Sequence, residues 1–294
     1  ATRGHIRYWP KTSVDGRTWT PVPPEPTASD GEKPPWMTLR FTRDGAWRWV
    51  AGPESLGTWD YQHRIRALDA VDGVSTRLSG QSVQGRPLYL AETADRPEFE
   101  LFVGRQHPPE VTGAIGMRAF MDTVFAETNL AQRFRDRYQL GVVPLMNPDG
   151  VALGHWRHNV GDTDLNRDWG AFEQPETRAV IDWVEAQEAA GRELVLMIDF
   201  HSTWEDLFYT PPKQDDPPDF VTRWLDASRE RLPDFPFRHV PSSNLEQANS
   251  KNYFYRSRGI PAVTYEVGDE TDRAAIRRAA TVFAEELMRL MVRL

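Results

Sequence analysis

From about Thr58 onward, short apolar segments alternate with longer amphipathic ones, and this alternation limits the possible folds most strongly. The apolar segments have the length and residue types of buried strands, and they cover residues 87–92, 99–104, 139–146, 194–200 and 262–267. The predicted helices cover residues 59–70, 110–127, 175–190, 218–232, 249–258 and 272–294. In the last of these, apolar side chains recur every three or four residues, as in a helix that packs on a core. The pattern predicts an α/β fold, a three-layer α/β/α sandwich with a mixed, mainly parallel sheet.

Residues 1–57 have a different character. They contain five of the eleven tryptophans, and Trp59 follows just beyond them. Asp15-Gly16 and Asp44-Gly45 lie between aromatic and β-branched runs, which is a hairpin signal. We therefore expect a small antiparallel β unit at 1–57 and a main domain at 58–294. The tryptophans are expected to be core or interface residues, and a sugar-binding face is the alternative.

Composition excludes several classes of site and ligand. The chain has no cysteine, which excludes disulfides, thiolate metal sites and a cysteine nucleophile. Its net charge of −8, from 43 acidic and 35 basic residues, argues against nucleic acid as a partner. No stretch approaches the roughly 18 apolar residues of a membrane span. We expect a soluble protein, whose location, cytoplasmic or exported, and oligomeric state the sequence does not decide.

The stretch GRQHPPE, residues 104–110, places His107 and Glu110 directly after a predicted strand. Alone, such an H-x-x-E pair is common by chance. A second buried strand, however, ends at His201. Because ligands gather at the carboxyl ends of strands in parallel sheets, the three side chains are expected to converge. Two histidines and a glutamate form a known zinc ligand set that leaves one coordination position open for water.

A third strand, residues 262–267, carries Glu266 near its end. A buried carboxylate is costly unless it is paired, whereas beside a metal site it can act as a general base for water. The alternative is an ordinary surface glutamate at a strand end. Three strand ends with compatible ionisable groups favour the general base.

The polar loop 147–169 brings Arg157, Asn166 and Arg167 close together in sequence. Guanidinium and amide groups suit a substrate carboxylate, and an arginine near a metal can stabilise an oxyanion. Asp164 can accept the second ring N–H of a ligating histidine. The alternative is a solvated loop with a surface ion pair. The loop also contains His155 and His158, which we expect to be polar loop residues, since the ligand set is complete without them.

In chain order, these motifs resemble the M14 zinc carboxypeptidase family. The order is H-x-x-E, NPDG, an arginine, D-x-N-R, a strand ending in histidine and a strand ending in glutamate. The resemblance covers residues 58–294. It implies a carboxypeptidase/phosphorylase-like fold for this catalytic domain, one bound Zn²⁺ and a peptide or protein C-terminus as the substrate.

RQHPPE is most similar to the H-P-G-E form of the cytosolic carboxypeptidase-like branch, which includes deglutamylating enzymes. That branch carries a β-sandwich ahead of its catalytic domain. Residues 1–57, which include SVDGRTWTPV, are similar to the second half of that sandwich. The resemblance thus implies that the antiparallel unit in this chain is incomplete.

The resemblance also assigns roles to residues. The zinc ligands would be His107, Glu110 and His201, and Glu266 would be the general base that activates the attacking water.

Four loop residues also match the family. Arg157 would polarise the scissile carbonyl and hold the oxyanion, and Asp164 would support the first histidine. Asn166 and Arg167 would bind the terminal carboxylate of the substrate.

Two departures concern the substrate end of the site. Pancreatic-type members have an arginine where this chain has Pro109. They also carry a mobile tyrosine about twenty-two residues before the base, where this chain has Asn244, Leu245 and Glu246. The contribution of that tyrosine is therefore absent or comes from another residue.

Lys251 is the candidate residue for specificity. In the family, the position fourteen or fifteen residues before the base, here Asn252 or Lys251, often lies at the floor of the substrate pocket. Lys251 there would attract an acidic side chain. The alternative is a lysine on the exposed face of the helix predicted at 249–258.

The sequence therefore predicts a zinc metallocarboxypeptidase that cleaves a C-terminal peptide bond, with a preference for acidic C-terminal residues. One alternative is a zinc amidohydrolase acting on cell-wall peptides or acyl amino acids, because the aspartoacylase and succinylglutamate desuccinylase relatives share H-x-x-E and the later histidine. NPDG together with D-x-N-R favours the peptidase. A further alternative is a non-catalytic zinc-containing binding module, which the complete set of ligands and base disfavours.

Overall fold

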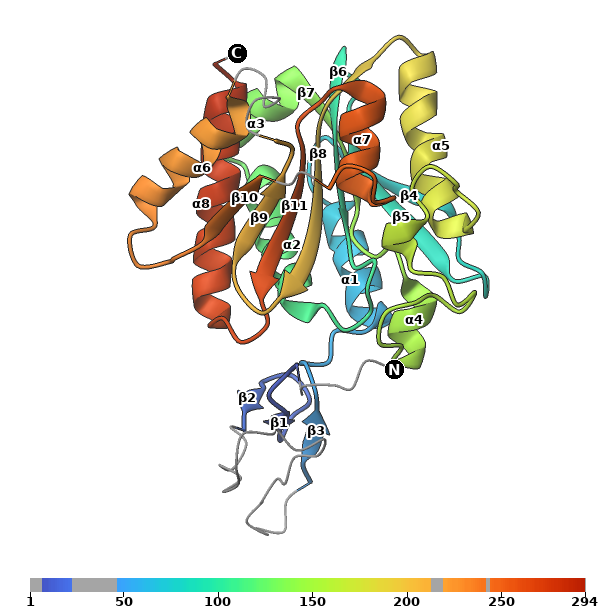
Figure 1. The fold of residues 1–294 in the computed structure, drawn as a ribbon, viewed down its shortest axis with the longest axis vertical. Helices are drawn as coiled ribbons and strands as arrows, with labels where there is room; N and C mark the ends of the chain where they lie inside the picture. Colours follow the sequence, from blue (N-terminus) through green and yellow to red (C-terminus); the bar gives the residue numbers. More distant parts are fainter. Residues whose placement is uncertain (1–6, 23–46, 213–218, 242–243, 294) are drawn as a thin grey trace. The chain divides into compact units, whose positions relative to one another are not determined.

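The structure is a computed structural model that describes residues 7–22, 47–212, 219–241 and 244–293 (Figure 1). The chain divides into two compact units, Ala1–Leu56 and Gly57–Leu294. None of the helices within the described ranges is both long and apolar enough to cross a membrane.

The smaller unit contains an antiparallel sheet in the order β2-β1-β3, formed by β1 (Lys11–Ser13), β2 (Thr20–Pro21) and β3 (Trp49–Ala51). The hairpin predicted at Asp15-Gly16 is confirmed. Gly16 has a φ of +70°, and the Asp15 carboxylate accepts hydrogen bonds from the Arg17 and Thr18 amides. The hairpin predicted at Asp44-Gly45 lies outside the described residues.

Of the described tryptophans in this unit, Trp19 is half-buried and the other three are exposed. Trp9, Trp47 and Trp49 are 42%, 91% and 58% exposed. These three are therefore not core residues, whereas the interface part of the expectation stays a prediction. Strands of two or three residues cover too little area to enclose side chains of this size.

The larger unit contains one sheet in the order β10-β9-β11-β8-β6-β7-β5-β4 (Figure 1). Its strands are β4 (Val74–Gln81), β5 (Pro87–Thr93), β6 (Glu98–Gly104), β7 (Tyr138–Val143), β8 (Glu193–Thr203), β9 (Leu207–Thr210), β10 (Arg238–Pro241) and β11 (Ala262–Gly268). The central strands β11, β8, β6 and β7 are parallel to their neighbours in that group, and antiparallel pairs flank them. The predicted mixed sheet is therefore confirmed.

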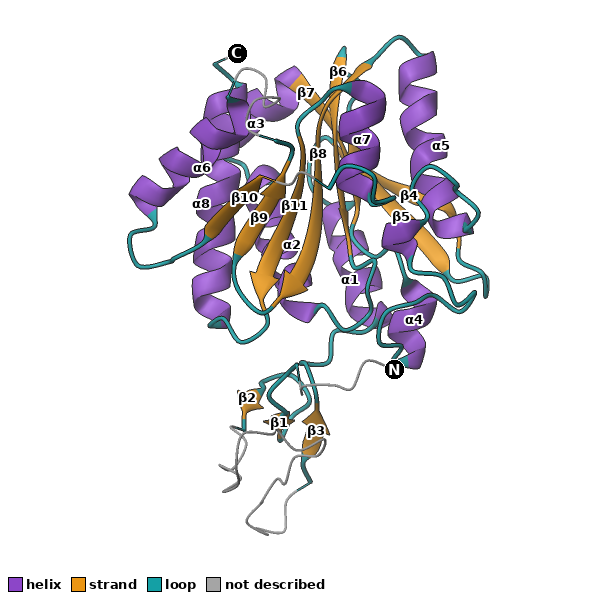
Figure 2. Cartoon of the chain, in the orientation of Figure 1, coloured by secondary structure: helices purple, strands orange, loops and turns teal. Residues whose placement is uncertain are grey.

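Helices cover both faces of this sheet (Figure 2). They are α1 (Thr58–Leu68), α2 (Val111–Val124), α3 (Asn129–Arg137), α4 (Pro148–Leu153), α5 (Pro175–Ala189), α6 (Phe220–Arg231), α7 (Ser250–Arg258) and α8 (Arg273–Met291). Side chains of α2, α3, α6 and α8 share one buried cluster with the sheet, and side chains of α5 and α7 share the other. This is the three-layer arrangement that the sequence predicts.

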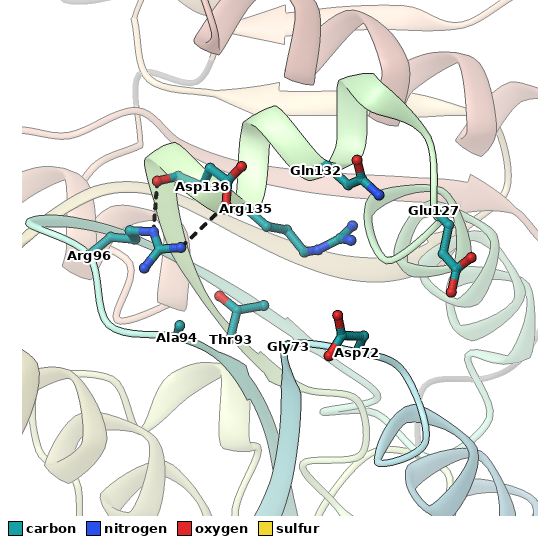
Figure 3. Close-up of a pocket in the computed structure, with 9 residues that line it drawn as sticks. All are labelled: Asp72, Gly73, Thr93, Ala94, Arg96, Glu127, Gln132, Arg135 and Asp136. Carbon is teal, nitrogen blue, oxygen red and sulfur yellow. Dashed lines mark hydrogen bonds and ion pairs between the residues drawn. The ribbon is translucent and has the colours of Figure 1, made fainter.

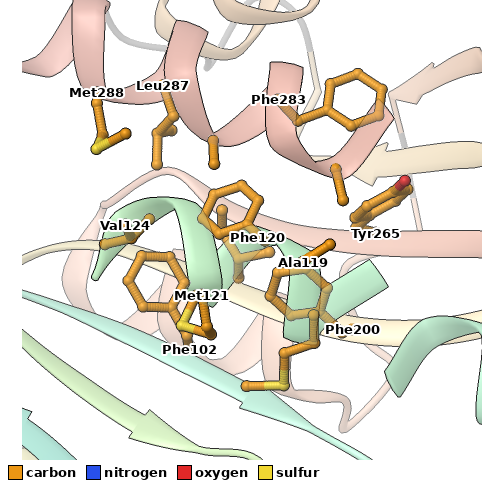
Figure 4. Close-up of a cluster of buried hydrophobic side chains, with 14 of the residues drawn as sticks. Phe102, Ala119, Phe120, Met121, Val124, Phe200, Tyr265, Phe283, Leu287 and Met288 are labelled. Atoms are coloured by element: carbon orange, nitrogen blue, oxygen red, sulfur yellow. The ribbon is translucent and has the colours of Figure 1, made fainter. Parts of the chain in front are cut away.

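The central strands are buried on both faces. In β6, Phe99, Leu101 and Val103 belong to the cluster under α5 and α7, whereas Phe102 belongs to the cluster under α2 and α8. In that second cluster, Phe102 and Phe200 of the sheet lie near Phe120 of α2 (Figure 4). Strands covered on both sides read as nearly continuous apolar runs, which is why the sequence reveals them.

A polar pocket of about 480 Å³ lies beside the starts of β6 and β7 (Figure 3). Arg96 and Arg135 line it together with three acidic side chains, and Arg96 binds Asp136. The pocket lies where β6 and β7 begin, whereas the predicted site lies beyond the carboxyl ends of the central strands. The two are therefore at opposite ends of the strands, and none of the predicted site residues lines the pocket.

Candidate functional site

The predicted metal ligands come from two adjacent parallel strands. β6 ends at Gly104, and His107 and Glu110 follow in the turn that leads into α2. His201 lies near the end of β8. On the next strand, Glu266 is the direct register partner of His201, so both side chains point to the same face of the sheet. All four residues therefore lie at the carboxyl ends of the neighbouring parallel strands β6, β8 and β11.

His107, Glu110 and His201 form one compact, buried cluster. Nδ1 of His107 lies 2.9 Å from Oε1 of Glu110, and Nδ1 of His201 lies 2.7 Å from Oε2 of the same carboxylate. Each residue offers one atom that could bind a metal ion, and these three atoms all lie within 4.8 Å of one another. Each of the residues is at most 4% exposed. Two imidazole nitrogens and a carboxylate facing one point fit a single zinc ion with an open coordination position.

A carboxylate supports the far nitrogen of each histidine. Nε2 of His107 lies 3.0 Å from Oδ1 of Asp164, the residue predicted for this position. Nε2 of His201 lies 2.8 Å from Oδ2 of Asp199. When Nδ1 of each histidine binds the metal, Nε2 carries the ring hydrogen, and this N–H group donates a hydrogen bond to the carboxylate. This is the usual arrangement behind metal-binding histidines.

The sequence reading did not identify Asp199. It is fully buried, and its Oδ2 also accepts hydrogen bonds from Nε2 of Gln106, at 2.6 Å, and from the Ser250 hydroxyl. The signal was present, since Asp199 precedes His201 by two residues on the same strand and must share its face. Gln106 and Ser250 gave no such signal, because they reach Asp199 from the turn after β6 and from α7 only in the folded chain.

The ionisable groups of the buried cluster shift one another's pKa values. Burial alone would lower the pKa of His201, but the carboxylates of Asp199 and Glu110 outweigh it and raise that pKa well above its usual value. The pKa of His107 is raised against burial by Glu110 and Asp164. For Glu110, burial is outweighed by the two histidines, so its pKa lies well below the usual value. A metal ion must therefore displace protons to bind here.

Close packing holds Glu110 and His201 together. A Cβ atom on Gly113 would lie only 2.3 Å from the His201 carbonyl oxygen, so α2 can approach the end of β8 only with glycine at this position. The Ser202 amide donates to Oε2 of Glu110 at 3.2 Å, and the Ser202 hydroxyl accepts from the Gly113 amide. The start of α2 and the end of β8 thus form one unit.

The loop that follows β7 carries Arg157 to the cluster. Buried Asn159 accepts from the amides of Gly161 and Thr163 and stabilises the turn of the loop. Nε of Arg157 then donates to Oδ2 of Asp164 at 2.7 Å. Asp164 therefore joins Arg157 to His107. Burial would raise the pKa of Asp164, but His107 and Arg157 outweigh it and hold that pKa well below its usual value. The loop is more than a solvated segment with a surface ion pair.

Asn166 and Arg167 have different surroundings. Asn166 is buried, with Oδ1 accepting from the Ser250 amide at 3.0 Å and Nδ2 lying 3.2 Å from Nε2 of His201. Arg167 is exposed, and its Nη1 donates to the Asn166 carbonyl at 2.5 Å. The structure thus places Asn166 at the cluster and Arg167 on the solvent side of it.

Lys251 is buried, not on an exposed helix face. It is 3% exposed, and Nζ donates to Oδ1 of Asn252 at 2.6 Å. Burial lowers the pKa of Lys251 to about 8. The preceding residue, Ser250, contacts both Asp199 and Asn166, so the first turn of α7 lies against the histidine cluster.

The loop histidines have local partners. Nδ1 of His155 lies 3.2 Å from the His158 carbonyl, and Nδ1 of His158 lies 3.0 Å from Oδ1 of Asp162. Among the described residues, the candidate metal cluster does not include either of them.

Replacing Asp199 with asparagine should weaken zinc binding about 10- to 100-fold, because the His201 ring would lose the negative partner that orients it and makes it more basic. Competition with a chromophoric chelator would measure this. The matched control is Asp149→Asn, another fully buried aspartate, which binds Ser82, Gln84 and Arg86 instead. Unchanged zinc affinity in the Asp199 variant would contradict a supporting role for this carboxylate.

Comparison with known proteins gives a consistent result. The family model described as Peptidase_M14, zinc carboxypeptidase, matches residues 67–281. Cytosolic carboxypeptidase 2 of Xenopus tropicalis is 31% identical over an alignment of 137 residues, and the match covers 41% of this chain and 14% of that protein. The Danio rerio protein of the same name is 27% identical over an alignment of 181 residues, and the match covers 56% of this chain and 25% of that protein. The matched segments thus span a quarter or less of these relatives.

The fold is similar to that of a metallo-carboxypeptidase from Burkholderia cenocepacia. The two structures match with a TM-score of 0.78 over 97% of this chain and 80% of that chain. Sequence identity is 23%, so this likeness supports the fold.

Proposed function

Because this chain belongs to the zinc carboxypeptidase family, we propose that it is a zinc metallocarboxypeptidase that removes the C-terminal residue of a peptide or protein. The observation that carries this proposal is the convergence of His107, Glu110 and His201 on one point, with Glu266 in register on the neighbouring strand. These residues supply a complete ligand set and a base at one edge of the sheet.

In this proposal, bound zinc supplies a Lewis acid that activates water and polarises the scissile carbonyl. Glu266, half-buried beside His201, takes a proton from the attacking water and passes it to the leaving amine. Arg157, anchored by Asp164, stabilises the oxyanion that develops. Asn166 and Arg167 bind the terminal carboxylate, and guanidinium suits that task because it can form two parallel hydrogen bonds.

The proposal includes a preference for acidic C-terminal residues, and buried Lys251 supports it. A buried cation is costly unless it is paired. Within the part of the chain that the structure describes, Nζ of Lys251 donates to the neutral amide oxygen of Asn252 and not to a carboxylate. An acidic substrate side chain would provide the missing opposite charge.

Lys251→Met should lower kcat/KM for peptides ending in glutamate about 10- to 100-fold, the range expected for a lost charged hydrogen bond. Peptides ending in leucine should be little affected. Because burial lowers the pKa of Lys251 to about 8, the lysine is charged below that pH and neutral above it. The preference for glutamate over leucine should thus decline as pH rises through about 8. An unchanged preference in the variant would refute this role.

A peptide library with varied last residues, analysed by mass spectrometry with and without a chelator, tests the proposed function. We expect release of single C-terminal residues, glutamate and aspartate first, and none with the chelator. Cleavage of muropeptides or acyl amino acids but not of ordinary peptides would instead indicate an amidohydrolase. Stoichiometric zinc without hydrolysis of any substrate would indicate a binding module.

A further inference from the structure

Arg105 stands out in the turn that carries His107 and Glu110. It is 3% exposed and has a φ of +56°, in the left-handed region that residues other than glycine rarely adopt. Such a conformation persists only when the surrounding contacts hold it, and it is often found at functional sites. The contacts of Arg105 therefore indicate its purpose.

The Arg105 side chain folds back across its own turn. Nε donates to the Pro108 carbonyl oxygen at 2.8 Å, between the two predicted ligands of this turn. Nη1 donates to the hydroxyl of Tyr61 on α1 at 2.9 Å, and the guanidinium carbon lies 5.8 Å from the centre of the Tyr61 ring. Tyr61 is itself buried. The arginine thus ties the ligand turn to a helix that provides no ligand.

The backbone fixes the opposite side of the same turn. The Arg105 carbonyl accepts from the Asn147 amide at 3.2 Å, and the Gly104 carbonyl accepts from the Met146 amide at 3.0 Å. These bonds fix the start of the turn. Its middle, at Pro108, is held by the Arg105 side chain.

We propose that Arg105, braced by Tyr61, is a positioning residue that sets the spacing of His107 and Glu110 for metal binding. The inference rests on the metal site of the proposed function. A planar guanidinium suits this task because its N–H groups point in fixed and different directions, one toward Pro108 and one toward Tyr61. A lysine ammonium would not hold both acceptors in fixed geometry.

The decisive variant is Arg105→Gly. Glycine adopts the required backbone conformation without strain, so this change removes the side-chain bonds without adding backbone strain to the turn. We expect zinc affinity, measured by chelator competition, to fall about tenfold or more. We also expect the absorption spectrum of the cobalt-substituted protein to change, a readout that a loss of stability alone would not alter.

Tyr61→Phe is the matched second variant, because it keeps the ring and removes only the hydroxyl. It should weaken zinc binding in the same direction but less. The double variant should bind zinc no worse than Arg105→Gly alone, since both changes break one chain of contacts.

The outcomes separate this inference from the proposed function. Wild-type zinc affinity and an unchanged cobalt spectrum in Arg105→Gly would overturn the positioning role, as would a lower metal-free melting temperature with unchanged affinity. Zinc binding by the wild-type protein without hydrolysis would overturn the proposed function alone. Absence of zinc binding in the wild-type protein would overturn both.

Discussion

Glu266→Gln should leave zinc stoichiometry unchanged and lower kcat on the order of 10³-fold. Glutamine has nearly the same shape but cannot accept and return a proton, and general base catalysis contributes about 10²- to 10⁴-fold. Glu266 is the register partner of His201 and is not a member of the metal cluster, so the ligand set should survive. Steady-state kinetics on a glutamate-ended peptide, with metal analysis of the same sample, would measure both quantities.

The matched control is Glu270→Gln, the same chemical change in the turn that follows β11. It should keep most of the activity, because Glu270 lies beyond the strand that carries the predicted base. Turnover close to the wild-type level in Glu266→Gln would overturn the mechanism. Loss of zinc together with activity would show that Glu266 is needed to form the metal site.

The sequence predicted the parts of the fold that are buried on two sides. Strands such as β6 and β8 contain long apolar runs because helices cover both faces. β4 was missed because it is a mostly polar, partly exposed edge strand, and β9 and β10 were missed because they have only four residues each. Short helices such as α3 and α4 were missed as well, since few residues carry little periodicity.

At the site, the order of the residues along the chain could be predicted, but their side-chain contacts with other elements could not. His107, Glu110 and His201 could be brought together because strand ends share an edge. The contact of Gln106 with Asp199, and that of Arg105 with Tyr61, join different elements and depend on side-chain direction. The burial of Lys251 depends on which side of α7 faces the sheet, and nine helical residues of mostly polar character do not reveal it.

His201→Ala should abolish zinc binding at micromolar metal and reduce activity to that of chelator-treated wild-type protein. Two ligands would remain, and a catalytic zinc site needs three from the protein. Returning Zn²⁺ should restore chelated wild-type enzyme but not the variant. His158→Ala is the matched control, because His158 lies outside the cluster and contacts Asp162 instead. It should keep both zinc and activity.

The same variant should also lose stability without metal. His201 lies between Glu110 and Asp199, which are 4% and 0% exposed, and removing one partner of a buried ion pair typically costs about 3–5 kcal/mol. The raised pKa of His201 sets the sign of the pH dependence. Its stabilising contribution is fully present below the unfolded-state pKa of about 6.5 and is lost as pH rises through the higher folded-state value. Metal-free melting temperatures of wild type and variant should therefore differ most near pH 6 and converge at alkaline pH. Equal stability across that range would show that the buried carboxylates do not depend on this imidazole, and would contradict the coupled cluster described above.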